Sequence, residues 1–346
     1  MHTRSGDAPK RPNALDELTG ELTASDFVIS ENENETVITD KPVSSISMGA
    51  LFANRYQLEH RLGVGATSDV WRAFDTAHNR LVALKIMRDS RDASDDDWNG
   101  RFHREARLLS RIRNPNVIEV FDYATEPKPY LAMELLEGED LEARLRREER
   151  IALRACVPII TQLCAGLACV HAAGIVHRDI KPANIYCMSS GVVKLVDFGL
   201  AKKPHHYLRP LNEMTDATTL EAPITRRGNV VGTVKYMSPE QLSRNEVDFR
   251  SDLWSAAVVL YRMLTGTMPF SGSSDIDVMI RIVREPSPAP SRDAKDLPLK
   301  IDHFFVRALQ KDPLNRFTSA FEMGDAFSRI VNGTTTRPPP PRPPRP

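Results

Sequence analysis

Four side chains that could do chemistry lie close together between residues 177 and 199, in the stretch HRDIKPANIYCMSSGVVKLVDFG. Asp179 and Asp197 supply carboxylates, Lys181 supplies an ammonium and Asn184 supplies a carboxamide. Transfer of a phosphoryl group needs a carboxylate to accept a hydroxyl proton, a cation to neutralise charge and oxygen ligands for magnesium. Oxygen donors such as Asp and Asn suit Mg2+. The stretch therefore indicates phosphoryl transfer.

The order of these motifs resembles that of the protein kinases. HRD, then KxxN, then DFG is the signature order of that family. Lys181, two residues after Asp179, is similar to the serine/threonine branch, and HRDIKPANI is similar to the eukaryotic-like Ser/Thr kinases of bacteria. The resemblance implies that Asp179 deprotonates a Ser or Thr hydroxyl, that Lys181 balances phosphoryl charge, and that Asn184 and Asp197 hold magnesium while ATP is the phosphoryl donor.

Length and charge narrow the class of protein. The 346 residues suit a two-lobed domain with tails. Lys plus Arg and Asp plus Glu balance at 46 each, so no overall field attracts nucleic acid or an anionic membrane. The N-terminus shows no apolar signal-peptide region, and a cytoplasmic location is expected. The cysteines lack metal-ligand spacing and are interpreted as buried thiols: Cys156, Cys164, Cys169 and Cys187.

One uncharged stretch, from Cys156 to Val176, is long enough to cross a membrane. It runs directly into His177, so a span there would divide the catalytic stretch between the bilayer and the water phase. We therefore expect a buried helix of the large lobe and no membrane span.

The expected organisation is a disordered acidic tail (1–50), a small lobe with hinge (51–137), a large lobe (138–331) and a Pro/Arg-rich tail (332–346). Thr36 and Thr39 lie among acidic residues, so the first tail is either a docking site for a phosphothreonine-binding partner or a solvated linker. The last tail is either a ligand for a proline-motif-binding partner or a spacer.

A small antiparallel sheet is expected from Arg55 onward, where apolar residues alternate in YQLEHRL, DVWRAFD and RLVALKIM. Between the first two runs lies GVGATSDV, where Gly63 and Gly65 let backbone N–H groups close over phosphates without a Cβ in the way. This segment resembles the glycine-rich loop of the kinases, except that Ser68 stands at the third glycine. Val70 would then cover the base.

Lys85 ends VALK, which is similar to the family's VAIK and implies a lysine that steadies the α- and β-phosphates. A lysine on an apolar strand needs a counterion, and the candidate is Glu105 in the helical stretch RFHREARLLSRI. We expect a Lys85–Glu105 ion pair; the alternative is that Glu105 is a surface glutamate among arginines.

By the same resemblance, Met133 is the gatekeeper and the backbone of residues 134–136 is the hinge that binds adenine. Asp140 stands where the family contacts ribose, and it is equally suited to cap the helix LEARLRREER. Tyr186 stands beneath the adenine, where its ring would stack on the base. The expected nucleotide contacts are Leu62, Gly63, Val64, Gly65, Ala66, Thr67, Ser68, Val70, Ala83, Lys85, Met133, Glu134, Leu136, Asp140 and Tyr186.

The segment from Asp197 to Glu240 is long for the family and lacks periodicity, so a mobile activation loop is expected. Arg178 would receive a phosphate from this loop. Thr233 resembles the threonine that bridges the catalytic aspartate and lysine. The candidate sites of activating phosphorylation are Thr225, Thr219 and Thr218.

Three more residues resemble structural positions of the kinase family. Asp252 in SDLWSAAVVLYRMLTG matches the buried aspartate that holds the backbone at His177 and Arg178. Glu240 in SPE is expected to pair with Arg316 in KDPLNRF, which anchors the activation segment to the large lobe.

The pieces occur in family order over most of the chain and predict an α+β protein kinase fold, with a small antiparallel-sheet N-lobe and a mainly helical C-lobe. The predicted function is an active Ser/Thr kinase acting on protein substrates. A scaffold that binds partners without transfer is the alternative, supported by Ser68, Ser238 and the long loop. A small-molecule phosphotransferase is disfavoured by the GTxxYxxPE element. Related kinases often pair through their small lobes, so a homodimer is among the expected partners.

Overall fold

The computed structural model describes residues 46–65, 67–88, 98–198, 234–243 and 246–333. All of them belong to one compact unit, Ile46–Pro346. Several sequence predictions concern residues outside these ranges: most of the two tails (1–45 and 334–346), Ala66 of the glycine loop, and the threonines Thr218, Thr219, Thr225 and Thr233.

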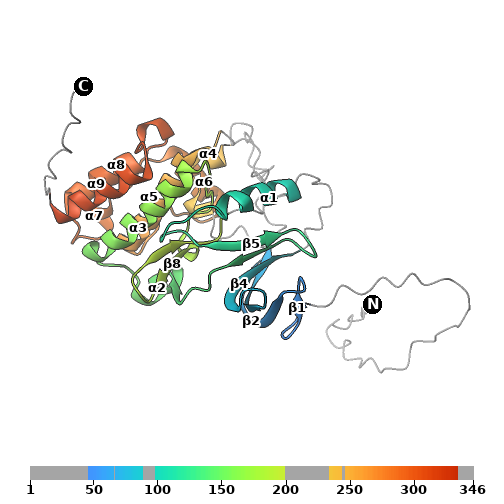
Figure 1. Cartoon of the computed structure of the whole chain (residues 1–346). Coiled ribbons are helices and arrows are strands. Elements are labelled where there is room, and N and C mark those ends of the chain that lie inside the picture. Colours follow the sequence, from blue (N-terminus) through green and yellow to red (C-terminus); the bar gives the residue numbers. More distant parts are fainter. Residues whose placement is uncertain (1–45, 66, 89–97, 199–233, 244–245, 334–346) are drawn as a thin grey trace, which may run out of the picture. The chain divides into compact units, whose positions relative to one another are not determined.

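Six antiparallel strands form the larger sheet, in the order β1-β2-β3-β4-β6-β5. This confirms the small antiparallel sheet expected from the alternating apolar residues. The strands are β1 (Leu51–Phe52), β2 (Tyr56–Val64), β3 (Ser68–Asp75), β4 (Arg80–Met87), β5 (Val120–Ala124) and β6 (Tyr130–Met133). Helix α1 (Trp98–Leu109) packs against β5, as Figure 1 shows.

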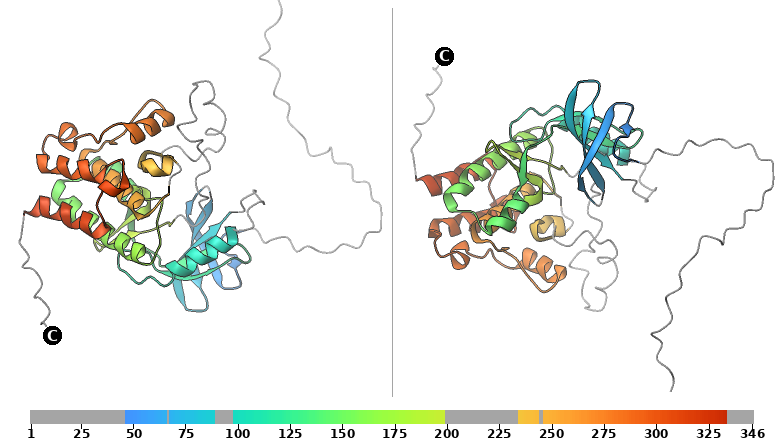
Figure 2. Two further views of the ribbon diagram at one scale, coloured as in Figure 1. Left: turned by 90° about the horizontal axis from the view of Figure 1, so that it is seen from above. Right: turned by 90° about the horizontal axis from the view of Figure 1, so that it is seen from below.

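Most of the remaining described chain is helical. Its helices are α2 (Leu141–Glu148), α3 (Leu153–Ala172), α4 (Pro239–Leu242), α5 (Phe249–Thr265), α6 (Asp275–Arg284), α7 (Pro290–Asp293), α8 (Leu299–Ala308) and α9 (Ala320–Asn332). Helix α3 contacts α5 and α9, and α5 contacts α7 and α8. The two views of Figure 2 show these helices gathered apart from strands β1 to β4, which matches the predicted separation of a sheet lobe and a helical lobe.

Most of the uncharged stretch that begins at Cys156 lies in α3, the one helix in the described ranges that is long and apolar enough to cross a membrane. Eight of its residues are buried, and seven of these belong to the main hydrophobic cluster of the domain. The helix therefore has the role predicted from the sequence, that of a core helix in the large lobe.

A second, three-stranded sheet carries the catalytic stretch between the two lobes. It has the order β7-β8-β9 and consists of β7 (Gly138–Asp140), β8 (Ile185–Met188) and β9 (Val193–Leu195). A 3-10 turn, η1 (Pro182–Asn184), immediately precedes β8. Val117 bridges to Leu195, so the end of β9 is tied to the loop after α1. This sheet fixes the backbone on both sides of the functional side chains.

Candidate active site

The backbone before Asp179 is held by one buried carboxylate. Asp252, on α5, accepts the backbone N–H groups of His177 and Arg178, each at 2.8 Å. His171 Nε2 lies 2.9 Å from the same carboxylate. Arg178 has a φ of +63°, a left-handed conformation that costs about 1–2 kcal/mol for a non-glycine residue. The hydrogen bonds to Asp252 offset that cost, and they are the contact expected of this residue.

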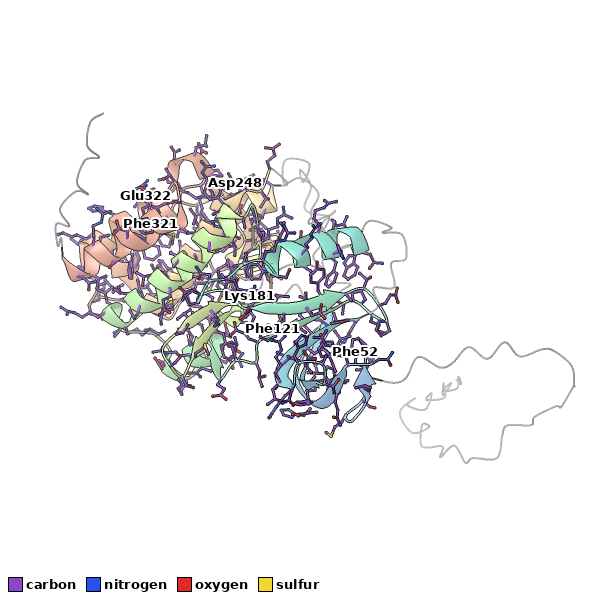
Figure 3. The ribbon with its side chains drawn as sticks, viewed as in Figure 1. Phe52, Phe121, Lys181, Asp248, Phe321 and Glu322 are labelled. Carbon is purple, nitrogen blue, oxygen red and sulfur yellow. The ribbon has the colours of Figure 1, made fainter. Side chains whose placement is uncertain are left out.

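Asp179 lies at the centre of a group of three functional side chains. Its Oδ2 atom is 3.1 Å from Lys181 Nζ and accepts a 3.0 Å hydrogen bond from Asn184 Nδ2. The same Asn184 amide donates to the backbone carbonyl of Asp179 at 2.8 Å. The structure thus brings together all three residues singled out in KxxN and HRD, and it fixes the direction of the carboxylate. Figure 3 labels Lys181, which lies between α3 and β5 in that view.

His177 supports the end of β9 from inside the core. Its side chain is fully buried, and its Nε2 lies 3.0 Å from the carbonyl oxygen of Val196. A carbonyl only accepts, so Nε2 carries the proton. Burial holds the pKa of His177 below its usual value. The ring also lies 4.5 Å from that of Phe198, which fixes the backbone on either side of Asp197.

Lys85 contacts Asp197. Its Nζ atom lies 2.5 Å from Asp197 Oδ1, and the lysine side chain is 11% exposed. Burial alone would raise the pKa of Asp197, but the nearby Lys85 ammonium outweighs it and holds the pKa below its usual value. The lysine therefore has a counterion, although a different one from that predicted.

The expected Lys85–Glu105 ion pair is not formed among the described residues, so this prediction was wrong for the conformation seen here. Burial raises the pKa of Glu105, and the charges that act against this rise are those of Arg178, Arg101 and Arg104. The Glu105 carboxylate is thus stabilised by three nearby guanidinium groups, while the ammonium of Lys85 is already paired with Asp197. The alternative, a glutamate among arginines, describes its surroundings better, although Glu105 is half-buried rather than on the surface.

A small cavity lies next to this ion pair. Of the expected nucleotide contacts, Lys85 and Met133 line it, and Asp197 and Phe198 complete its wall together with apolar residues of α1, β5, β6 and the loop between α1 and β5. Ala83 is buried directly opposite Met133 in the sheet register. The remaining lining residues are Leu109, Ile118, Val120 and Leu131.

The glycine loop joins β2 to β3. Gly65 N donates to the carbonyl of Ser68 at 2.8 Å, and a Cβ on Gly65 would lie only 3.0 Å from that oxygen, so any larger residue would crowd the turn. Ser68, at the position of the missing third glycine, is buried. Thr67 accepts a backbone hydrogen bond from Arg88. Two apolar residues at the end of β2, Leu62 and Val64, are exposed, while Val70 packs against the main core.

The hinge side of the site has two polar anchors. Glu134 follows β6, and its Oε1 accepts the backbone N–H of Glu119 at 2.8 Å and lies 2.6 Å from Lys194 Nζ on β9. Asp140 caps α2, because its carboxylate accepts Ala143 N at 2.7 Å. The capping interpretation of Asp140 is therefore confirmed, and the ribose contact stays a prediction. Leu136 packs against the core between these two anchors.

Tyr186 lies on β8, opposite Asp140 in the register. Its hydroxyl donates to the carbonyl of Gly138 at 2.8 Å, so the ring is fixed to β7. Burial raises the pKa of Tyr186. Stacking of this ring on adenine stays a prediction.

Glu240 and Arg316 form the ion pair predicted from SPE and KDPLNRF. Both side chains are buried, and the two Nη atoms of Arg316 donate to the two carboxylate oxygens of Glu240, each at 2.7 Å. Ser251 Oγ adds a third hydrogen bond to Glu240 at 2.6 Å. Ser238 caps α4 with a reciprocal bond to Gln241, so the serine in SPE is compatible with the fold.

Comparison with known families decides the identity. A family model described as the protein kinase domain matches residues 56–327. The chain belongs to this family.

Several bacterial kinases resemble this kinase domain. PknL of Mycobacterium tuberculosis is 35% identical over 82% of this chain and 67% of its own length. PknB of Bifidobacterium longum, a probable serine/threonine-protein kinase, is 37% identical over 82% and 41%. A probable serine/threonine-protein kinase of Clostridium acetobutylicum is 32% identical over 82% and 41%. The chain therefore spans about two fifths of the length of the last two of these relatives.

The fold of the kinase domain also matches solved structures. The PknI kinase domain of Mycobacterium tuberculosis superposes with a TM-score of 0.64 at 25% identity, covering 82% of this chain and 99% of that chain. This likeness agrees with the small sheet lobe and the helical lobe described above.

Sequence reasoning missed several residues that hold the kinase site together. Gln241 Nε2 donates to the carbonyl of Arg178 at 3.2 Å, and Asn116 Nδ2 donates to that of Val193 at 2.9 Å. Lys194 ties β9 to Glu134. Each contact joins segments far apart in the chain, and no motif marks the two partners as a pair.

Proposed function

We propose that this kinase domain transfers the γ-phosphoryl group of ATP to Ser or Thr hydroxyls of protein substrates. The observation that carries the proposal is the buried Asp179 carboxylate, oriented by Asn184 and next to the Lys181 ammonium. A carboxylate fixed in this way suits a general base, because its direction is set before the hydroxyl arrives. Lys181 would balance the charge that develops on the transferred group.

The donor set fits magnesium. Asn184 uses its Nδ2 for Asp179, which leaves its carbonyl oxygen as a donor, and Asp197 contacts Lys85 through only one of its two oxygens. The described residues contain no group of three or more His, Cys, Asp or Glu side chains, and magnesium needs few protein ligands. Asn184 and Asp197 would hold the ion, which would neutralise phosphate charge.

The nucleotide side of the site would be formed by the glycine loop, Lys85, Met133 and the backbone of residues 134–136. In this proposal Lys85 steadies the α- and β-phosphates and Glu105 becomes its second partner when α1 moves toward it. Tyr186 and Asp140 would border the adenine and ribose.

Partners and regulation belong to the same proposal. Protein substrates follow from the kinase family, and activation-loop phosphorylation at Thr225, Thr219 or Thr218 would be read by Arg178. Tail-binding partners, pairing of two copies through the small lobes and a cytoplasmic location complete the proposal.

The test combines purified wild type, Asp179→Asn and Lys85→Met with Mg-ATP and a protein acceptor, and maps phosphate by mass spectrometry. Phosphate on the acceptor and on the activation-loop threonines is expected for the wild type only. Undiminished transfer by Asp179→Asn would overturn the assignment of the base. Nucleotide binding without any transfer would favour the scaffold.

A further inference from the structure

An arginine outside the kinase motifs makes three hydrogen bonds beside the catalytic loop. Arg262, on α5, donates Nη1 to Glu142 Oε2 at 2.5 Å and Nη2 to Glu142 Oε1 at 2.9 Å. Its Nη1 also donates to the hydroxyl of Tyr236 at 2.7 Å. Hydrogen bonding to Arg262 holds the pKa of Glu142 below its usual value, so the pair is charged at neutral pH.

The two helices that supply this ion pair also hold the catalytic loop. Helix α2, which carries Glu142, packs against η1, the turn that contains Asn184. Helix α5, which carries Arg262, supplies Asp252 to the backbone before Asp179. A group fixed to both helices is therefore fixed relative to the catalytic carboxylate.

Tyr236 belongs to η4 (Val234–Tyr236), the first described turn after the activation loop. Its ring is buried, and its backbone carbonyl accepts a 2.7 Å hydrogen bond from Ser255 Oγ of α5. Five residues after Tyr236, Gln241 donates to the carbonyl of Arg178. The turn is thus attached to α5 at both its side chain and its backbone, close to the catalytic loop.

An arginine is suited to this position. The guanidinium is a planar fork that can bind both oxygens of Glu142 and still donate to a third acceptor. A lysine carries its donors on a single nitrogen, which cannot bind the two carboxylate oxygens in parallel as the two Nη atoms do while also reaching the hydroxyl. A carboxylate and a buried hydroxyl deprived of these bonds would no longer hold η4 in one place.

We propose that Arg262 is a positioning residue for the protein acceptor: by holding Tyr236 it fixes η4, and through it the approach of the substrate hydroxyl to Asp179. The inference rests on the proposed kinase function. It assigns Arg262 to the acceptor side of the reaction and not to ATP.

The test uses the full chain as wild type, Arg262→Met, Tyr236→Phe and the double variant, with Arg329→Met as a control at an exposed helical ion pair with Asp325. Two rates are measured: phosphate transfer to myelin basic protein, and hydrolysis of ATP without an acceptor. Arg262→Met and Tyr236→Phe are each expected to lower kcat/KM for the acceptor about tenfold and to leave the KM for ATP and the hydrolysis rate unchanged. The double variant should be no worse than Arg262→Met alone.

Three results would overturn the inference. Arg262→Met could transfer phosphate as well as wild type and Arg329→Met do. Phosphate transfer and ATP hydrolysis could fall by the same factor in a variant whose unfolding temperature is also lowered, which would indicate a merely structural role. The effects of the two single variants could also simply add in the double variant. An inactive wild type would remove the proposed kinase function itself, and this inference with it.

Discussion

Lys85 contacts Asp197 rather than Glu105, and the surroundings of the two carboxylates explain this choice of partner. Asp197 lies in the wall of the same cavity as the ammonium, so one short contact satisfies both charges. Glu105 lies near the guanidinium groups of Arg178, Arg101 and Arg104. If it moved away to reach Lys85, it would lose their favourable electrostatic interaction. The active arrangement proposed for the kinase therefore requires an exchange of partners at this lysine.

A first prediction concerns Asp252. In Asp252→Asn one oxygen becomes an NH2 group, which cannot accept the backbone N–H of His177 or Arg178. We expect a loss of about 1–3 kcal/mol in unfolding free energy and a fall of about tenfold or more in kcat, because Asp179 is displaced. Denaturant unfolding and steady-state kinetics measure the two effects.

The matched control is Asp248→Asn, at the N-cap of the same helix. Asparagine caps helices as well as aspartate does, so stability and activity should stay close to those of the wild type. Equal losses in the two variants would contradict the special role of Asp252.

A second prediction concerns the pH dependence of the Glu240–Arg316 pair. Burial acts to raise the pKa of Glu240, but the hydrogen bonds from Arg316 outweigh it and hold the pKa below its usual value. The folded state therefore binds this proton less readily than the unfolded state, so the stabilisation is fully present above the unfolded pKa of 4.5 and is lost as pH falls below it.

The measurement compares the unfolding free energy of the wild type and Glu240→Gln across pH. At pH 7 the difference should be about 3–5 kcal/mol, because the variant leaves a buried guanidinium without its carboxylate. The difference should shrink as the pH falls below 4.5. If the difference in unfolding free energy stayed constant over this pH range, the ion pair could not be its cause.

At the scale of elements, α3 shows how closely a helix can approach a loop. Gly166 faces the backbone of Asn116, the residue whose side chain also donates to Val193 at the start of β9. Because Val117 then bridges to Leu195, the distance between α3 and this loop sets the position of the strand that leads to Asp197.

A third prediction follows for Gly166→Ala. The added Cβ would lie 2.6 Å from the carbonyl oxygen of Asn116, which is backbone and cannot rotate away. We expect a loss of about 1–3 kcal/mol despite the higher helix propensity of alanine. Thermal unfolding measures the change. Ala165→Ser, on the exposed side of the same helix, should change stability by less than about 0.5 kcal/mol, and similar losses at both positions would contradict the close approach.

At the scale of the whole domain, the site is assembled from both lobes. Lys85 comes from the six-stranded sheet, Asp179 from the catalytic stretch and Asp252 from a helix of the large lobe. A nucleotide that contacts Lys85 and Asp197 together would bind only the folded domain.

A fourth prediction is that Mg-ADP stabilises the chain as a whole. At a hundredfold excess over its dissociation constant it should add about 2.7 kcal/mol to the unfolding free energy. Lys85→Met should weaken this effect, since it removes the proposed phosphate contact. Differential scanning calorimetry with and without nucleotide tests both statements, and an equal gain in the variant would contradict the role of Lys85.

The sequence alone predicted the α+β fold, the contact of Asp252 and the Glu240–Arg316 pair, and it offered the cap at Asp140 as one of two interpretations. Each of these follows either from a local sequence pattern or from a pair of family motifs in which both interacting residues can be recognised. The partners of Lys85 and Arg262 could not be predicted, because each depends on which of several charged residues the fold brings close. Lys85 and Asp197 are 112 residues apart, and Arg262 and Glu142 are 120 apart.

The Glu240–Arg316 pair has a consequence for the growing chain on the ribosome. Arg316 follows Glu240 by 76 residues, so at about 5–20 residues per second the carboxylate waits roughly 4–15 seconds for its guanidinium. During that interval the residues up to Glu240 have already left the ribosome's decoding centre, but the large lobe cannot close around a lone charge. A nascent chain halted before Arg316 should remain open to proteases, even though every catalytic side chain has been made.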